Sequence, residues 1–429
     1  MVVGAAVGVE PVCATLLEIV ERKMVALRML LEEHPLSKKV PRALLQMLCI
    51  GVLRNYRLLE VALRYCGYSG PVRSSRRGWL PLIIAYEAIF RRKFVSIDRL
   101  SRYEDIVSIE TLKCLFQLEL EDVLRQYSGD ERLSVKYSVP LWVVRKLKEL
   151  QPPNGVESLL KAFNERMPQW IRFNKNIIDS REATKLLASI GIEVEPDPVL
   201  DDLLMIRSVA PGGLAKLDPR MFYVQDRSAA LVAHVLGCPM QPLGDFFSAP
   251  GGKVSHAVWR CLTPAISIEI SRRRLISEQK LLKRQQVWCP VLVEADARRP
   301  PLRREGLGAA IVDPDCSSIG RIGHSPETRL FLEKAGPSIV HRLSRLQRRA
   351  LATIVELVKR GGTIVYSTCT LTFEENEHVV KWVADNYGVE ILEARPWIGV
   401  SSPLDERMQR VYPHISRCSG GFVAKLLKI

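Results

Sequence analysis

From residue 242 to its end, the chain alternates short apolar runs with longer segments of helical periodicity. The apolar runs predict buried strands at residues 243–247, 265–270, 291–294, 309–312 and 363–367, with a closing strand at 420–427. The segments between them predict helices, including a strongly basic one at 272–286 and a long one at 346–360 that Gly361 and Gly362 end. Strands that alternate with helices form a parallel sheet with helices on both faces. The sequence therefore predicts an α/β domain in which ligands gather at the carboxyl ends of the strands.

A glycine-rich turn follows the first of these strands, in the stretch Ser248-Ala-Pro-Gly-Gly-Lys253. Glycine lets backbone amides approach a ligand closely, and the helix that starts beyond the turn favours negative charge. The turn is not a phosphate-binding P-loop, because Phe247 and Val254 occupy positions where that motif needs glycine and a hydroxyl residue. A dinucleotide-binding fingerprint is also absent, so the turn alone indicates only a ligand site.

Three carboxylates follow successive strands: Glu269, Asp296 and Asp313. An acidic residue after the second strand is where nucleotide-binding α/β folds hold ribose hydroxyls, so Glu269 is a candidate for that role. Asp296 is a candidate acceptor for an adenine amino group. Each alone could be a surface carboxylate, but three at one edge of a sheet favour an adenosine site.

Two cysteines lie at the same predicted edge. Cys316 follows the fourth strand, and Cys369 follows the strand at 363–367. A free cysteine is most often a small buried hydrophobic residue. Neighbouring strands would bring both thiols to one ligand, however, which makes Cys369 a candidate nucleophile. The acidic residues Glu374, Glu375 and Glu377 suit the first turn of a following helix.

The segments before residue 242 predict two smaller modules. Residues 1–150 carry apolar residues at helical spacing and predict an all-α domain with a basic face. Gln151-Pro-Pro-Asn-Gly marks a boundary, and residues 151–220 predict a small α/β module with strands near 170–174 and 192–194. Residues 221–429 then form the main α/β domain.

Composition limits the partners and the compartment. The 429 residues carry a formal net charge of +15, which favours a polyanionic partner, with nucleic acid the default candidate and a basic protein without such a partner the alternative. No apolar run is long enough to cross a bilayer, and the first ten residues lack the positive charge of a secretion signal. The ten cysteines are scattered singly, so we expect no disulfide framework, no metal site and a cytoplasmic protein.

Taken together, the motifs resemble the signature set of the Sun/Nop/Fmu family of RNA cytosine-5 methyltransferases. The matching stretches are Ser248-Ala-Pro-Gly-Gly-Lys253, Asp313-Pro-Asp-Cys-Ser317, Ser367-Thr-Cys-Thr-Leu371, Glu375-Asn-Glu377, Gln225-Asp-Arg-Ser228, Gly421-Phe-Val-Ala-Lys425 and Arg172-Phe-Asn174. They cover the chain from about residue 170 to its C-terminus. Arg42 and the stretch Gly51-Val-Leu-Arg-Asn-Tyr56 resemble the NusB-like RNA-binding domain found in one branch of that family.

The resemblance implies a Rossmann-like class I domain that binds S-adenosylmethionine, and a thiol mechanism. Cys369 would add to carbon 6 of a flipped cytosine, and Asp313 would hold the ring's N3 and amino edge. Cys316 would assist loss of the carbon 5 proton and release, and Lys253 would polarise the base. The implied cofactor pocket comprises Phe247, Ser248, Ala249, Pro250, Gly251, Gly252, Lys253, Glu269, Arg274, Asp296 and Asp313.

The sequence departs from the family pattern at Asp315, where most relatives have proline. A carboxylate beside Cys316 predicts a raised pKa for that thiol and slower release. Two other functions remain open. DNA cytosine methylation would use the thiol of the fourth-strand motif, whereas Thr368-Cys369 favours RNA; the second is a NusB-like RNA-binding scaffold with an inactive methyltransferase domain. We expect a monomer without metal that acts on structured ribosomal or transfer RNA, and the sequence leaves open which.

Overall fold

The computed structural model describes residues 8–288 and 290–429, and the chain divides into two compact units. Unit 1 comprises Met1–Glu165 together with Ile322–Pro337, and unit 2 comprises Arg166–Arg321 together with Ser338–Ile429. Residues 1–7, on which the expectation about a secretion signal partly depends, lie outside the described residues. Within the described residues, no helix has both the length and the apolar character that a membrane span requires.

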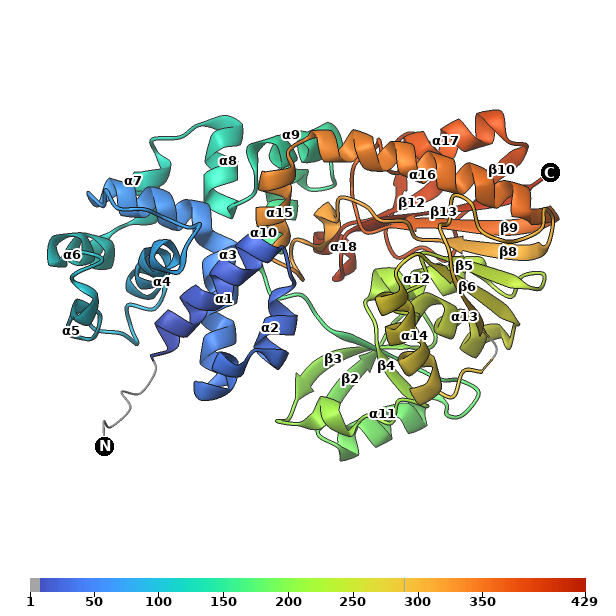
Figure 1. The fold of residues 1–429 in the computed structure, drawn as a ribbon, viewed down its shortest axis with the longest axis horizontal. Coiled ribbons are helices and arrows are strands. Elements are labelled where there is room, and N and C mark those ends of the chain that lie inside the picture. Colours follow the sequence, from blue (N-terminus) through green and yellow to red (C-terminus); the bar gives the residue numbers. More distant parts are fainter. Residues whose placement is uncertain (1–7, 289) are drawn as a thin grey trace. The chain divides into compact units, whose positions relative to one another are not determined.

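Unit 1 is built from helices around one apolar core that includes Tyr56 and Trp79 (Figure 1). Its helices are α1 (Val9–Lys23), α2 (Leu27–Glu33), α3 (Arg42–Tyr65), α4 (Arg76–Phe90), α5 (Ile97–Leu100), α6 (Ile109–Gln117), α7 (Leu120–Leu124), α8 (Gly129–Tyr137), α9 (Leu141–Glu149), α10 (Gly155–Asn164) and α15 (Thr328–Ala335). The apolar stretch at 112–124 forms two helices rather than one, because Leu118 and Glu119 adopt extended backbone. Two acidic residues in the first turn of α7 favour this new start.

Helix α15 belongs to unit 1 although its sequence lies between motifs of unit 2. Arg329 is fully buried and donates hydrogen bonds to the carbonyls of Ile322 and Phe163. Glu333 of α15 pairs with Arg57 at 3.0 Å and with Arg73 at 2.8 Å. The compact helical unit therefore extends past the predicted boundary at 150, through α10, and also takes in Ile322–Pro337, which the sequence analysis assigned to the main α/β domain.

The first part of unit 2 is a four-stranded antiparallel sheet with strand order β2-β3-β1-β4. Its elements are β1 (Trp170–Phe173), α11 (Ser180–Ser189), β2 (Ile192–Pro196), β3 (Leu203–Val209) and β4 (Phe222–Val224). Strand β3 was not predicted from the sequence, and the predicted module ended at residue 220. Strand β4 pairs with β1, so the module continues through Val224. Arg172 of β1 is buried and donates to the Gly252 carbonyl and to Ser255 Oγ, which ties this module to the glycine turn.

The larger sheet of unit 2 has strand order β11-β12-β13-β9-β8-β5-β6-β7, with β10 paired to β13. Its strands are β5 (Leu243–Phe246), β6 (Ala265–Glu269), β7 (Pro290–Glu294), β8 (Leu307–Val312), β9 (Val358–Thr368), β10 (Val389–Leu392), β11 (Val400–Ser402), β12 (Asp405–Val411) and β13 (Gly421–Lys428). Strands β5 to β9 pair in parallel, as predicted, whereas β10 to β13 pair antiparallel. The sheet is therefore mixed. The strand order reverses between β5 and β8, because β6 and β7 follow on one side of β5, and β8 and β9 on the other. Such a point is where α/β sheets bind ligands.

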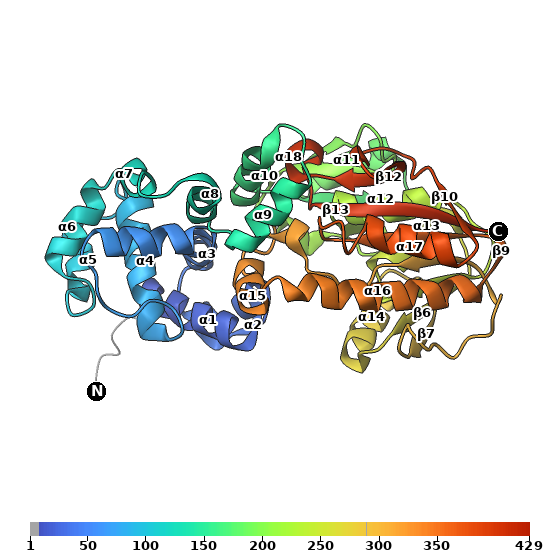
Figure 2. The same ribbon diagram turned by 90° about the horizontal axis from the view of Figure 1, so that it is seen from above.

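Helices cover both faces of this sheet. The helices α12 (Arg227–Leu236), α13 (Gly252–Cys261) and α14 (Arg272–Arg284) lie on one face, and α16 (Ser338–Leu357) and α17 (Glu377–Asn386) lie side by side on the other (Figure 1, Figure 2). Alternate residues of β8 serve the two faces: Ile311 packs with the α12 and α13 core, whereas Ala310 and Val312 pack with the α16 and α17 core. The side-chain period of two in a strand explains this division.

Gly361 and Gly362 do not end the long helix. Helix α16 runs from Ser338 to Leu357, and both glycines lie inside β9. A Cβ on Gly362 would lie 2.6 Å from the Gly308 carbonyl oxygen, so the close approach of β9 to β8 requires glycine there. The pair serves strand packing, a use that the sequence pattern alone does not distinguish from a helix stop.

Among the described residues, which exclude Cys289, the structure contains two disulfides, Cys66–Cys114 and Cys238–Cys261, contrary to the expectation of no disulfide framework. The partners are 48 and 23 residues apart in sequence, so no local spacing pattern reveals them. The thiols of Cys13, Cys49, Cys316, Cys369 and Cys418 are free.

Candidate active site

The glycine turn after β5 is held open by backbone geometry. Gly251 has φ of +95°, and a Cβ there would lie 2.8 Å from Glu278 Cγ, so a larger residue is excluded. Phe247, just after β5, also adopts a left-handed conformation with φ of 61°. Ser248 Oγ donates to Glu278 at 2.7 Å, which fixes the turn against α14.

Glu269 at the end of β6 supplies an acceptor beside this turn. Its Oε1 accepts from the Ser271 amide, whereas its buried Oε2 has no hydrogen bond. Arg274 Nη2 lies 3.4 Å from Oε2 and donates to the Ala249 carbonyl at 3.1 Å. The structure thus brings together five of the predicted cofactor residues, Ser248, Ala249, Gly251, Glu269 and Arg274, and leaves one buried carboxylate oxygen available for a ligand.

Asp296, in contrast, has its carboxylate engaged. Arg298 contacts both oxygens, at 3.0 Å and 2.6 Å, and these hydrogen bonds lower the pKa of Asp296. The residue lines a cavity of about 750 Å³ together with Arg299, Arg349 and Trp382. It therefore offers no free acceptor to an adenine amino group in this structure.

Cys316 and Cys369 stand on the loops that follow the neighbouring parallel strands β8 and β9, and their Sγ atoms lie 2.9 Å apart. The hydrogen bond from Cys316 is the largest influence that lowers the pKa of Cys369, and Arg321 and Ser318 add to it. That contact and burial together raise the pKa of Cys316 well above its ordinary value. Cys369 is therefore the thiol that ionises first, and Cys316 keeps its proton.

The cause expected for the raised pKa of Cys316 was wrong. The Asp315 side chain is 63% exposed and lies 3.7 Å from Arg274 Nη1. Solvent and this guanidinium screen its charge. The thiol responds instead to Cys369, to burial, and to the carboxylates of Glu375 and Asp313.

Lys253 and Asp313 form an ion pair next to the two thiols, with Nζ 2.5 Å from Oδ2. Burial works against the charged ammonium, but the neighbouring Asp313 carboxylate outweighs it and raises the pKa of Lys253. Ser367 Oγ donates to the other oxygen of Asp313 at 2.9 Å. The pair places a fixed carboxylate and a fixed cation beside Cys369.

Glu375 holds the two cysteine loops together, a role that the sequence analysis missed. Its buried carboxylate accepts from the amide and hydroxyl of Ser317, from Thr372 Oγ1 and from Gln347 Nε2. Helix α17 begins only at Glu377, so Glu375 is not part of a first turn. The signal that could have suggested this is the hydroxyl-rich stretch Thr368–Thr372, which gives a buried carboxylate donors nearby.

Glu377 likewise acts as a buried partner rather than as a surface charge. Its carboxylate pairs with Arg410 of β12, both side chains being fully buried, and accepts from Ser402 Oγ at 2.6 Å. Arg410 also donates to the Leu371 carbonyl. These contacts anchor the loop after Cys369 to the antiparallel end of the sheet.

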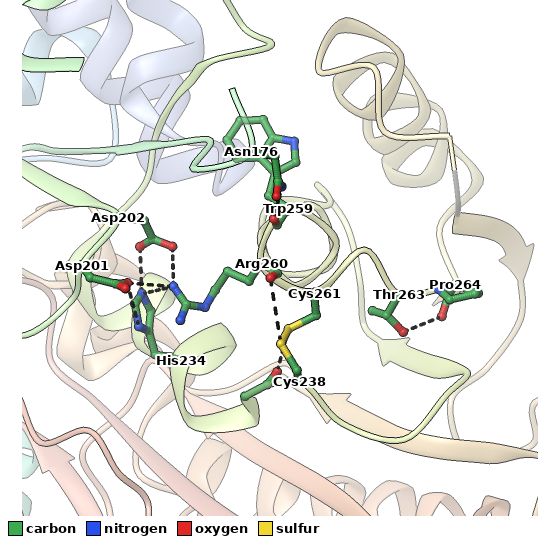
Figure 3. The surroundings of a disulfide bond; sticks show 11 residues. Asn176, Asp201, Asp202, His234, Cys238, Trp259, Arg260, Cys261, Thr263 and Pro264 are labelled. Carbon is green, nitrogen blue, oxygen red and sulfur yellow. Dashed lines mark hydrogen bonds and ion pairs between the residues drawn. A yellow bond between two sulfur atoms is a disulfide. The ribbon is translucent and has the colours of Figure 1, made fainter. Parts of the chain in front are cut away.

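A second polar cluster lies between the small module and the main sheet of unit 2 (Figure 3). Asp202 accepts from His234 Nε2 at 2.8 Å. It also accepts from His256 Nε2 at 2.9 Å. Ligand atoms of these three residues lie within 4.8 Å of one another, as in a metal site. Arg260 Nη1, however, lies 2.6 Å from the same carboxylate and supplies the positive charge that a metal ion would bring.

Comparison with known proteins agrees with this arrangement. Residues 240–427 match a family model described as 16S rRNA methyltransferase RsmB/F, and residues 139–211 match one described as Methyltr_RsmF/B-like, ferredoxin-like domain. The chain is 26% identical over 412 residues to Ribosomal RNA small subunit methyltransferase B of Cronobacter sakazakii, with 92% of each chain covered. It is 28% identical over 420 residues to the protein of that name from Klebsiella pneumoniae, again with 92% of each covered.

Solved structures share the fold. The structure titled "Crystal Structure of PH0851" superposes with a TM-score of 0.77 at 20% identity and covers 99% of this chain and 100% of its own. The structure of NSun6 from Pyrococcus horikoshii with SFG has a TM-score of 0.58 at 21% identity and covers 67% of this chain and 98% of its own.

A mixed sheet with the order reversal described above, a glycine turn beside a buried carboxylate, and paired thiols after β8 and β9 agree with a methyltransferase that has a Rossmann-like catalytic domain. The two family matches and the nearly full-length relatives identify it further. The chain belongs to the RsmB/F methyltransferase family.

Proposed function

We propose that the protein transfers a methyl group from S-adenosylmethionine to carbon 5 of a cytosine in RNA, with ribosomal RNA as the substrate. The observation that carries the proposal is the 2.9 Å separation of the Cys316 and Cys369 sulfur atoms beside the Lys253–Asp313 pair. The names of the relatives favour ribosomal over transfer RNA. A cytoplasmic location and the monomeric state belong to the same proposal.

The residues around the glycine turn fit the cofactor. Glu269 Oε2 is a buried acceptor that has the Arg274 guanidinium 3.4 Å away but no hydrogen bond, which suits a ribose hydroxyl, and Gly251 leaves room that a side chain would fill. The Arg274 guanidinium can pair with the carboxylate of the cofactor. S-adenosylmethionine bound there supplies an electrophilic methyl group.

The chain's own residues activate the base. The Cys369 thiolate forms a carbon–sulfur bond at carbon 6, and the electron pair displaced from the ring makes carbon 5 nucleophilic. Asp313, held by Lys253 and Ser367, accepts hydrogen bonds from the N3 and amino edge of the base as charge develops there. Carbon 5 would then form a bond to the methyl group as the methyl–sulfur bond of the donor breaks, which would leave S-adenosylhomocysteine.

Release restores the aromatic ring. Removal of the carbon 5 proton returns its electron pair to the ring and expels Cys369 as a thiolate. Cys316 is the base in this scheme: it keeps its proton while Cys369 is a thiolate, and it loses that proton to solvent only after Cys369 has bonded to carbon 6. Its raised pKa makes its thiolate a strong base once formed.

The RNA-binding scaffold is the alternative function, and the chemistry-bearing residues argue against it. A scaffold needs neither the lowered pKa of the Cys369 thiol nor the buried Lys253–Asp313 ion pair beside that thiol. DNA as the substrate is disfavoured by Thr368-Cys369, the motif of the RNA enzymes in the resemblance described above.

The test measures transfer of labelled methyl groups to total RNA by the wild-type protein, Cys369→Ala and Cys316→Ala. Cys369→Ala should lose methylation, and Cys316→Ala should accumulate protein covalently attached to RNA, seen as a slow band in a denaturing gel. Bisulfite sequencing of the product RNA identifies the cytosine.

Cys49→Ala is the matched control, because Cys13 and Cys49 form another buried thiol pair at 2.9 Å, in unit 1. Tight RNA binding without methylation by the wild type would favour the scaffold, and an active Cys369→Ala would refute the role given to that thiol.

A further inference from the structure

We propose that the exposed face of α16 binds the phosphodiester backbone of single-stranded RNA, and that the cavity at its C-terminal end holds a base of the same strand. The proposal rests on the proposed function and adds to it a binding surface and a second base subsite. Its substrate class is unpaired RNA flanking the reactive cytosine.

Three arginines form one stripe on α16. Arg342, Arg345 and Arg349 are all exposed, and none makes a hydrogen bond or ion pair with another described residue. Residues three and four apart share one face of a helix, and the rise of 1.5 Å per residue separates these three by about 4.5 and 6 Å along the axis. Successive phosphates of a nucleic acid strand have a comparable spacing, so unpaired cations in such a row suit a polyanionic chain.

The cavity of about 750 Å³ continues this stripe, since Arg349, Ala352, Thr353 and Glu356 line it. Its acidic residues are already paired: Asp296 with Arg298, and Glu356 with Arg304. Arg299 and Arg349 remain without an acidic partner, so the lining attracts an anion.

An aromatic wall completes the cavity. Trp382 and Tyr387 line it, with ring centroids 5.6 Å apart, and the Arg348 guanidinium lies 5.8 Å from the Trp382 ring. Aromatic rings beside cations are how proteins bind unstacked bases without sequence preference. A cavity of this size admits one nucleotide.

The opposite side of α16 holds the catalytic loops. Ser344 Oγ donates to the Glu374 carbonyl at 2.6 Å, and Gln347 Nε2 donates to the Asp315 carbonyl at 3.0 Å and to Glu375. One helix thus carries the arginine stripe on one side and fixes the loops of Cys316 and Cys369 on the other. RNA bound along α16 would be held by the element that positions both thiols.

The first experiment measures the salt dependence of binding of a labelled single-stranded RNA oligonucleotide. The triple variant Arg342→Gln, Arg345→Gln and Arg349→Gln should lower the slope of log K against log salt by about 2, since each lost phosphate contact on a single strand removes about 0.7. The matched control is Lys280→Gln, Lys283→Gln and Arg284→Gln. It removes the same charge from α14, on the opposite face of the sheet (Figure 1). Equal losses in both triples, or no loss in the α16 triple, would overturn the proposal.

The second experiment tests the base subsite. Trp382→Leu should weaken binding of the oligonucleotide by roughly 5- to 150-fold, the loss expected when one base loses its stacking partner. Trp288→Leu is the control, because Trp288 is 72% exposed and lies outside the cavity. If Trp382→Leu binds the oligonucleotide with unchanged affinity and has a normal circular dichroism spectrum, the proposed base subsite is refuted.

These binding measurements need no methyl transfer, so the two proposals fail separately. If the wild-type enzyme methylates RNA and the α16 triple variant binds and turns over RNA normally, the proposed function stands and the proposed RNA-binding surface is refuted. If the wild-type protein binds RNA through α16 but transfers no methyl group, the proposed surface stands and the proposed function is refuted.

Discussion

The Cys316 sulfur lies 2.9 Å from the Cys369 sulfur with no bond between them, and the contact moves the two pKa values in opposite directions. One thiol serves as the hydrogen-bond donor that stabilises its neighbour's thiolate. Ser318 Oγ, 3.4 Å from Cys369 Sγ, adds a second donor to the same atom. This asymmetry is what distinguishes a nucleophile from a helper within one pair.

Removing either donor should raise the pH at which Cys369 becomes reactive. Because Cys316 is the stronger influence, Cys316→Ala should move the inflection further than Ser318→Ala. The measurement is the rate of Cys369 alkylation by iodoacetamide against pH, followed by mass spectrometry of its peptide. Ser401→Ala, a substitution on an exposed position, should leave the profile unchanged. An inflection that stays fixed in both donor variants contradicts the assignment.

Glu375→Ala should lower the free energy of unfolding by about 3 kcal/mol, because it leaves buried donors of Ser317, Thr372 and Gln347 without their acceptor. Urea denaturation measures the loss. Glu390→Ala, on an exposed strand position, should change stability by less than about 0.5 kcal/mol. Methylation by Glu375→Ala should also fall, since the loops of Cys316 and Cys369 lose their common anchor; a fully active, equally stable variant would show that the anchor is dispensable.

Acid should destabilise the protein through His256. Burial lowers the pKa of His256 from its ordinary 6.5 to about 4, so the unfolded chain takes up a proton that the folded protein does not. The stability is fully present above pH 6.5 and falls as the pH approaches 4, by about 3 kcal/mol from this residue. The facing groups are Asp202, whose pKa is lowered, Arg172 and His234.

Urea midpoints between pH 7.5 and 4.5 measure this dependence. His256→Gln should flatten the curve, and His341→Gln, a change at an exposed position, should not. A curve of the same steepness in wild type and His256→Gln would contradict the linkage.

The two disulfides should be detectable chemically. Alkylation without reductant, followed by peptide mapping, should modify Cys369 and leave Cys66, Cys114, Cys238 and Cys261 unmodified. Reduction of the 23-residue Cys238–Cys261 loop should lower the free energy of unfolding by about 3 kcal/mol. In the double variant Cys238→Ser and Cys261→Ser, reductant should not lower the free energy of unfolding by this amount, because this disulfide is absent. Full alkylation of all four cysteines without reductant would exclude the bonds.

The sequence predicted the parts of the fold that depend on local pattern. Strands β5 to β9 were predicted because each is a short apolar run, and the adjacency of Cys316 and Cys369 followed from the rule that parallel strands end at one edge. Among the predicted cofactor residues, Arg274 contacts both the Ala249 carbonyl and Glu269, and their role in binding a cofactor stays a prediction.

What the sequence did not predict depends on contacts between distant segments. Glu375 looks like a helix-start residue until its donors from the Cys316 loop are known. Gly362 looks like a helix stop until the Gly308 carbonyl is placed against it. The ion pair between Asp296 and Arg298 could not be predicted either. Oppositely charged residues that lie close in sequence are common in loops, and most such pairs contribute little to stability.

The excursion of Ile322–Pro337 into unit 1 has a consequence for how the protein is made. Glu333 of α15 pairs with both Arg57 and Arg73. These ion pairs with the N-terminal helices therefore form only after about three quarters of the polypeptide has left the ribosome. The N-terminal part is synthesised first but therefore cannot complete its packing first. A gene fragment that ends before codon 328 encodes these helices without α15.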